Sequence, residues 1–241
     1  MDPDTKPTVC RTLGATHLRR LRAIWRSAGW PCHDPVEAEL LVAGALARMH
    51  DAAGRETLRV TDAGLALIAA EVQRQRRARD RHEALVERVA RAMQRAGRIV
   101  WRGLALRAPP QGDSRTWPLA IPDVYSIRHT SVEDFVEPVV HEIKVRRADL
   151  LSDLRHEAKR EAYRALSGEC WYVIEAGIGA PDEIPADYGV MLARADALEV
   201  ARPAARRAMR LPFMTWMALA RASAEPPLDD DAQPGLTAAE P

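Results

Sequence analysis

The segment "PVVHEIKVRRADLL", residues 138–151, has the alternation of a buried strand but carries two charged side chains on one face. Successive side chains of a strand point to opposite faces, so Glu142 and Lys144 lie on the same side. Valine and isoleucine residues flank the pair and favour a strand that is buried on at least one face. An exposed ion pair at a sheet edge is the alternative, which the aliphatic neighbours disfavour.

The whole chain has the composition of a globular protein. Its 241 residues are 47% hydrophobic and 29% charged, which is enough for one large or two small domains with a substantial core. The N-terminal sequence "MDPDTKPTVCRTLG" lacks the layout of a secretory signal, and no apolar run approaches the roughly 18 residues of a membrane span. We therefore expect a cytoplasmic protein without a membrane partner.

The cysteines do not indicate a disulfide framework or a zinc knuckle. Cys10, Cys32 and Cys170 are an odd number, are widely spaced and form no CxxC pair. Cys32 precedes His33, but two adjacent residues rarely serve one tetrahedral metal site, so a loop or core role is favoured for them.

The N-terminal region contains two helix patterns followed by a short strand. Apolar spacing predicts a helix over residues 13–28, and a second helix opens within "DPVEAELLVAGALARMH" with Asp34 as its cap. A strand over residues 57–60 leads into "VTDAGLALI". This order resembles the winged-helix pattern over about residues 10–72, which implies contact with DNA or with protein. A small helical packing module is the alternative.

The rest of the chain predicts an α/β domain. A linking helix is expected over residues 73–97, which overlaps a helical pattern at about 69–96. Strands are expected over residues 98–106, 119–128, 135–145, 169–177 and 188–195, with a helix over 147–168. This order gives a sheet covered by helices on both faces. Residues 222–241 are rich in proline and acidic residues and poor in large apolar ones, so a disordered tail is expected there.

Asp123 in "IPDV" supplies a second carboxylate for the pair on the central strand. If the strands at 119–128 and 135–145 form a hairpin, Asp123 comes next to Glu142. Two close carboxylates repel each other unless a cation lies between them, and Mg²⁺ takes oxygen ligands. Lys144 could then orient a water or stabilise charge on a phosphate. His141 faces the other side of the strand, where a packing or surface role is favoured.

These residues resemble the motif of the PD-(D/E)XK nuclease superfamily. The motif is present as Pro122-Asp123 and Glu142-Ile143-Lys144, and the resemblance implies a restriction-endonuclease-like mixed sheet flanked by helices. It also implies that Asp123 and Glu142 bind Mg²⁺ or Mn²⁺ and that Asp123, Glu142 and Lys144 are catalytic. A carboxylate on the preceding helix often joins this site in the family; Glu87 is our choice, with Glu83 as the other candidate.

The segment from Glu142 to residue 174 is also similar to MmcB-like DNA repair proteins. That similarity implies accessory roles for Asp149, Lys159 and Tyr163, of which the last two lie one helical turn apart. The resemblance covers about residues 83–195. We expect a nuclease-like domain at 98–212, preceded by its first core helix at about 83–97. An MmcB-like core requires neither the N-terminal module nor the acidic tail, so the subfamily stays open.

The sequence thus predicts a Mg²⁺-dependent deoxyribonuclease of DNA repair or defence. Four arginines near the motif are expected to contact the DNA: Arg146, Arg147, Arg155 and Arg160. The alternative is a non-catalytic, DNA-binding regulatory protein that uses the winged helix. The sequence leaves open DNA against RNA, single against double strands, and monomer against homodimer.

Overall fold

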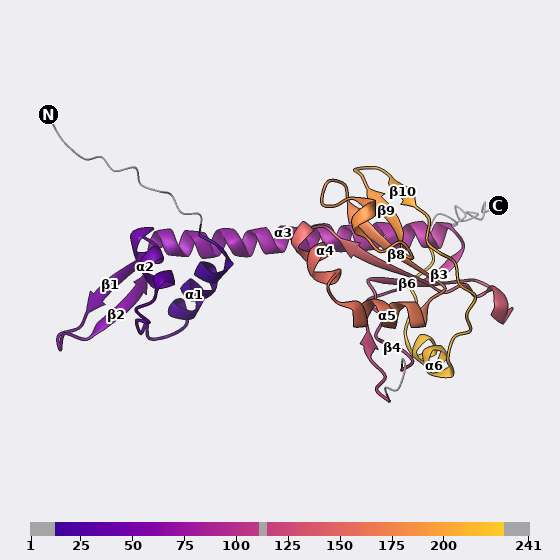
Figure 1. Ribbon diagram of the computed structural model, residues 1–241, viewed down its shortest axis with the longest axis horizontal. Helices are drawn as coiled ribbons and strands as arrows, with labels where there is room; N and C mark the ends of the chain where they lie inside the picture. The colour runs from indigo at the N-terminus through magenta and orange to yellow at the C-terminus, as the bar shows by residue number, and fades with distance from the viewer. Residues whose placement is uncertain (1–12, 111–114, 229–241) are drawn as a thin grey trace, which may run out of the picture. The chain divides into compact units, whose positions relative to one another are not determined.

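The computed structural model describes residues 13–110 and 115–228, and the chain divides into two compact units between Arg77 and Ala78 (Figure 1). This division falls inside the predicted linking helix. Within the described residues, no helix combines the length and the hydrophobicity that a membrane crossing requires.

The first unit is built from helices and one hairpin. Its elements are α1 (Ala15–Trp25), α2 (Pro35–Val42), β1 (Leu46–His50), β2 (Glu56–Val60) and the beginning of α3 (Asp62–Arg95). Asp34 caps α2 by accepting a hydrogen bond from the backbone of Glu37 (2.9 Å). The helix stops before Gly44, whose φ of 68° is left-handed, and the end of "DPVEAELLVAGALARMH" forms β1 instead. Leucine side chains from α1, α2 and both strands form the core of this unit.

The second unit contains a mixed six-stranded sheet, which confirms the predicted α/β class. The strand order is β10-β9-β8-β7-β6-β3. The strands are β3 (Arg98–Arg102), β6 (Val124–Arg128), β7 (Val139–Lys144), β8 (Glu169–Glu175), β9 (Gly189–Ala193) and β10 (Leu198–Arg202). β7, β8 and β9 run parallel, and the other neighbours pair antiparallel.

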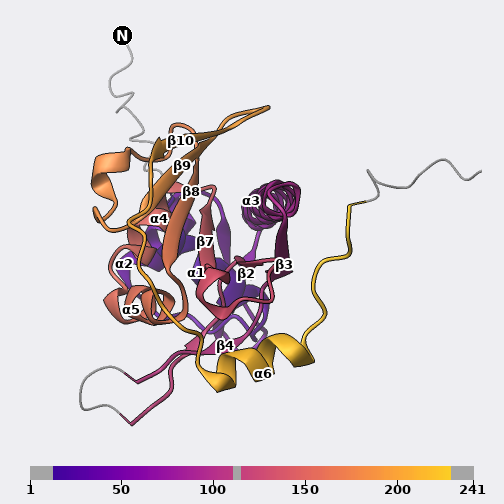
Figure 2. The same cartoon turned by 90° about the vertical axis from the view of Figure 1, so that its right-hand side faces the viewer.

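Helices cover both faces of this sheet. The second half of α3 packs on one face through Leu85, Val86 and Val89, and α5 (Glu157–Leu166) packs on the other face through Tyr163 and Leu166. Figure 2 shows α3 and α5 on opposite sides of the strands. The remaining elements of this unit are α4 (Arg147–Asp153), α5 (Glu157–Leu166), α6 (Phe213–Arg221), the short ladder of β4 (Leu106–Arg107) with β5 (Leu119–Ala120), and 3₁₀ turns at Glu133–Phe135 and Pro181–Glu183.

The structure differs from the sequence expectations at several places in this unit. The strand expected over residues 98–106 ends at Arg102 with β3, and the strand expected over 119–128 is divided into β5 and β6. The helix expected over residues 147–168 is split into α4 and α5 by a turn at 154–156. β10 and α6 have no counterpart among the predicted elements. Residues 222–228, which belong to the predicted disordered tail, lie along β3, where Glu225 N donates to Val100 O (2.7 Å) and satisfies the free edge of the strand. The rest of that predicted tail, residues 229–241, lies outside the described residues.

Candidate active site

Adjacent antiparallel strands bring Asp123 and Glu142 to the same level of the sheet. Val124 of β6 is paired with His141 of β7, so the register continues with Asp123 opposite Glu142, one residue beyond the ladder. The side chain of Asp123 is fixed there because its Oδ2 accepts a hydrogen bond from Ile143 N (2.7 Å). The hairpin expected from the sequence therefore places the two carboxylate residues on neighbouring strands.

Glu142 is buried and is held by two lysines. The residue is only 4% exposed, as expected for a central strand. Lys144 Nζ contacts Glu142 Oε1, and Lys159 Nζ from α5 lies 2.6 Å from the same oxygen. The other oxygen, Oε2, is buried and has no hydrogen-bond partner among the described residues. A buried carboxylate oxygen without a partner is costly, so this atom is free to take a further ligand.

Asp153, at the end of α4, completes this network and was not expected from the sequence. Its Oδ1 accepts from Lys159 Nζ (2.6 Å) and its Oδ2 accepts from the hydroxyl of Tyr172 (2.6 Å). Lys144 Nζ lies 3.7 Å from the same Oδ1. Burial alone would raise the pKa of Asp153, but the two ammonium groups and the tyrosine outweigh it and lower the pKa. Asp153 is therefore an ionised part of the cluster.

The four linked groups of the cluster balance in charge, and Asp123 adds a carboxylate next to them. Glu142 and Asp153 supply two carboxylates, and Lys144 and Lys159 supply two ammonium groups. Asp123 lies opposite Glu142 on the neighbouring strand, with His82 as its partner. The site thus combines a further carboxylate with a buried, unpartnered carboxylate oxygen. Oxygen donors of this kind suit Mg²⁺ or Mn²⁺, and Asp123 and Glu142 are the residues that would hold the ion.

The distribution of lysine along the chain is a signal that points to the same cluster. Lysine occurs at only three positions, 6, 144 and 159, among 35 lysine and arginine residues. Both lysines of the described residues therefore contact Glu142. An ammonium group is compact and fits a buried oxygen where the wider, planar guanidinium does not.

Tyr163 and Asp149, the other two predicted accessory residues, both lie near Lys159. The ring of Tyr163 has Lys159 Nζ 5.3 Å from its centre, and its hydroxyl donates to Ile121 O (3.0 Å). Burial, and after it the charge of Glu142, raises the pKa of Tyr163. Asp149 is exposed and lines a hollow of about 340 Å³ together with Asp153 and Lys159.

The helix α3 presents His82 and Glu83 to Asp123, but not Glu87. His82 Nε2 lies 3.4 Å from Asp123 Oδ1, and this contact raises the pKa of His82. Glu83 lines a hollow of about 400 Å³ that also contains Asp123 and Arg102. Glu87, our choice from the sequence, does not line this hollow and pairs with Arg91 (2.5 Å). The other candidate, Glu83, is the helical carboxylate that lines the same hollow as Asp123.

The four predicted DNA-binding arginines differ in whether groups of the protein already hold their side chains. Arg147 donates to Glu183 (2.8 and 3.0 Å), and Arg160 donates to Leu154 O (2.6 Å), so both are tied to groups of the protein. Arg146 lies 3.8 Å from Asp149. Arg155 is exposed, and its side chain has no hydrogen bond or ion pair with another described residue.

His141 packs on the opposite face of β7, as its position in the strand predicts. Its ring is fully buried and stacks on Trp171 with the ring centres 6.4 Å apart. Burial lowers the pKa of His141 to about 3, so the ring is neutral. It takes no part in the carboxylate cluster.

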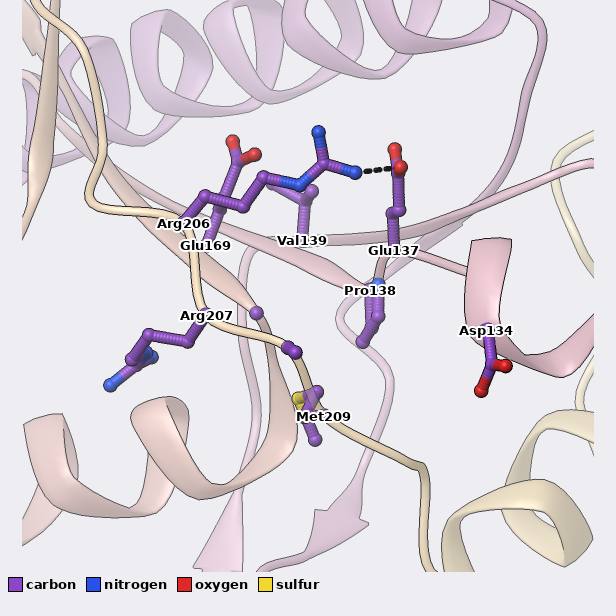
Figure 3. A pocket seen from close by; sticks show the side chains of 10 residues that line it. Asp134, Glu137, Pro138, Val139, Glu169, Arg206, Arg207 and Met209 are labelled. Carbon is purple, nitrogen blue, oxygen red and sulfur yellow. Dashed lines mark hydrogen bonds and ion pairs between the residues drawn. The ribbon is translucent and has the colours of Figure 1, made fainter.

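A third hollow, of about 330 Å³, lies at the other end of β7. Figure 3 shows Arg206 reaching Glu137 across it, with Glu169 and Val139 from the first residues of two parallel strands. Val139 and Lys144 are five residues apart, or roughly 16 Å along a strand. Arg206 and Glu137 pair with each other here, and no residue of the carboxylate cluster lines this hollow, so it is separate from the cluster.

The comparisons with known proteins give no family. No protein-family model and no curated protein matches the chain. A solved structure of a protein of unknown function from Silicibacter pomeroyi aligns with 55% of this chain and 76% of its own, at 22% identity and a TM-score of 0.38. A TM-score this low does not establish a shared fold.

Proposed function

We propose that the protein is a metal-dependent nuclease of the PD-(D/E)XK type that hydrolyses phosphodiester bonds in DNA. The observation that carries the proposal is the buried, unpartnered Oε2 of Glu142, set opposite Asp123 and beside two lysines. A purely structural ion pair would not need this arrangement. Both ammonium groups contact Oε1 of Glu142, whereas Oε2 has no hydrogen-bond partner among the described residues.

Each residue of the cluster has a role that follows from its position. Asp123 and Glu142 would hold the Mg²⁺ ion, which supplies charge neutralisation for the phosphate when it is bound. Lys144, with three N–H donors on a compact group, orients the attacking water and stabilises the developing negative charge. Lys159 and Asp153 fix the carboxylate of Glu142 and are positioning residues.

The test is cleavage of labelled single- and double-stranded DNA by the full chain with Mg²⁺, Mn²⁺ or EDTA. We expect cleavage with either metal, no cleavage with EDTA, and loss of cleavage in both Asp123→Ala and Lys144→Met. Asp182→Ala is the matched control, because Asp182 is exposed and lies outside the cluster. Circular dichroism must show the same helix content in all variants. Full activity of Lys144→Met, or cleavage in EDTA, would contradict the proposal.

A second candidate is a non-catalytic DNA-binding regulatory protein that acts through the first unit. It is favoured by Trp25 and Trp30, which are 58% and 61% exposed and could stack on bases, with arginines nearby in the same unit. This function predicts binding that weakens steeply with salt and no turnover with any metal. The same DNA substrates, measured by gel shift at two salt concentrations, separate the two candidates.

A further inference from the structure

The connection between α1 and α2 is held against the hairpin of the first unit. Leu58 N of β2 donates to Gly29 O (2.6 Å), as a neighbouring strand would. Gly29 has a φ of 76°, and a Cβ atom there would collide with Leu58 O, so this close approach requires glycine. The fixed connection leads into Cys32 and His33 and holds them next to the start of α2.

Glu37, in the first turn of α2, is a buried carboxylate with one unused oxygen. It is 1% exposed, and its Oε2 accepts from Cys32 N (2.6 Å) and His33 N (3.1 Å). Its Oε1 has no hydrogen-bond partner within the described parts of the chain. The neighbouring Asp34, by contrast, is paired with Arg20 (2.6 Å). A charged group buried in this way is costly unless another ligand reaches it.

His33 and Glu56 bring two more ligand atoms to Glu37. One ring nitrogen of His33 and one carboxylate oxygen from each of Glu37 and Glu56 all lie within 4.8 Å of one another. Glu56 is the first residue of β2, where the period of two puts it on the same face as the buried Leu58. His33 has a φ of 51°, a strained conformation for a residue other than glycine. This strained backbone conformation holds the ring of His33 near the two carboxylates.

We propose that His33, Glu37 and Glu56 form a site for a divalent transition-metal ion, with Zn²⁺ as the ion that fits the donor set. Imidazole with two carboxylates suits Zn²⁺, whereas Mg²⁺ and Ca²⁺ prefer oxygen ligands alone. His33 is exposed, so the ion can enter and water can complete its coordination. The bound ion gives the unused oxygen of Glu37 a partner.

Such an ion would connect three segments of the first unit. His33 belongs to the α1–α2 connection, Glu37 to α2 and Glu56 to the hairpin. Arg48 lies 3.3 Å from Glu56 Oε1, but its side chain is 52% exposed and can move into solvent when the ion binds. Because the ion binds the folded arrangement, it stabilises this unit against unfolding. The site is independent of the proposed nuclease centre, whose residues all lie in the second unit.

The experiment is a titration of the full, metal-free chain with Zn²⁺ in the presence of a competing chelating dye. We expect one tight equivalent in the wild type and a loss of affinity of at least about 100-fold in His33→Ala and Glu56→Gln, because removing even an outer-shell partner costs 10- to 100-fold. Glu37→Gln keeps an oxygen that can accept the hydrogen bonds from Cys32 N and His33 N, but it removes the charge. It should weaken Zn²⁺ binding as much as His33→Ala does. His129→Ala, at an exposed histidine of the second unit, is the control.

Two further variants make the ligand set falsifiable. Cys32→Ser should bind Zn²⁺ like the wild type, because its thiol is not part of the proposed site. Asp123→Ala should also bind normally, and excess Mg²⁺ should not displace the Zn²⁺. No tight equivalent in the wild type, or unchanged binding in both His33→Ala and Glu56→Gln, would overturn the site. Loss of binding in Cys32→Ser or Asp123→Ala would assign the ion to other ligands and would overturn it equally.

Discussion

Lys159 Nζ lies 2.6 Å from Glu142 Oε1, although the two residues come from different elements, α5 and β7. Lys144 contacts the same oxygen from two residues along the strand. Two ammonium groups thus fix one oxygen of a buried carboxylate, while its other oxygen, Oε2, has no hydrogen-bond partner among the described residues. Charge alone does not produce this geometry, because it depends on two compact donors that share one acceptor.

The first prediction is that arginine cannot replace either lysine. We expect Lys144→Arg to abolish metal-dependent DNA cleavage and Lys159→Arg to reduce its rate by about 10- to 100-fold, as for partners that orient a metal ligand. Each variant keeps the positive charge, but the planar guanidinium is too wide for the shared contact with Glu142.

The measurement is the initial cleavage rate under saturating Mg²⁺. The control is the reverse exchange, Arg221→Lys, at an exposed arginine of α6 that has no side-chain hydrogen bond or ion pair with another described residue, and its rate should stay near that of the wild type. Equal rates for Lys144→Arg and the wild type would mean that Lys144 provides charge only.

The second prediction concerns the pH dependence that Asp153 gives to stability. Its folded pKa lies below the ordinary value of about 3.9, so its ionised form stabilises the folded chain above that pH. This contribution is lost as the pH falls through the lowered pKa. Asp153→Asn should lower the free energy of unfolding at pH 7 by about 1–3 kcal/mol, the cost of a broken buried hydrogen-bond network.

Urea unfolding of both chains at pH 7 and at a series of values below 4 checks this expectation. The difference between wild type and Asp153→Asn should shrink as the pH falls, because the wild-type carboxyl also becomes neutral. A difference that stays constant down to pH 2 would show that the carboxylate charge contributes nothing and that only the shape of the side chain matters.

Local patterns were sufficient to predict the central part of the site. The period of two placed Glu142 and Lys144 on one face of β7, and a short connection between two strand patterns predicted that Asp123 would lie opposite Glu142. Helical spacing likewise put Lys159 and Tyr163 on one side of α5. Each of these relations needs only the geometry of one element or of two consecutive strands.

Other contacts depend on long-range packing and have no local signal. Asp153 sits in "LLSDLRHE", which reads as a polar position in one continuous helix; it becomes buried because the chain turns at residues 154–156 and α5 folds back over it. His82 reaches Asp123 only through the packing of α3 on the sheet. The sequence held one signal for the contact between Lys159 and Glu142, which is that the chain has only three lysines.

The third prediction concerns the segment after α6. Glu225 N donates to Val100 O, and its carboxylate pairs with Arg102 Nε (2.8 Å), so this segment covers the free edge of β3. A chain ending at residue 221 should melt at a lower temperature and should associate at high concentration, because an open strand edge can pair with another chain. A chain ending at 228 keeps both contacts and should match the full chain. Thermal melting and light scattering distinguish the two truncations, and equal behaviour would mean that the edge contact is not stabilising.

The fourth prediction decides which glutamate of α3 serves the metal site. Glu83 lines the hollow that contains Asp123, whereas Glu87, one helical turn further along, is paired with Arg91. The two residues share a chemical type, a helix and partial exposure, so Glu83→Gln and Glu87→Gln form a matched pair with the same loss of charge.

We expect Glu83→Gln to raise the Mg²⁺ concentration needed for half-maximal cleavage by about 10-fold or more, because a carboxylate near the ion is lost. Glu87→Gln should leave that concentration unchanged and should cost only the few tenths of a kcal/mol of a surface ion pair between residues four apart. A larger effect of Glu87→Gln than of Glu83→Gln would return the role to Glu87 and would require α3 to rotate in the presence of metal. No effect of either substitution would leave Asp123 and Glu142 as the full set of carboxylate ligands.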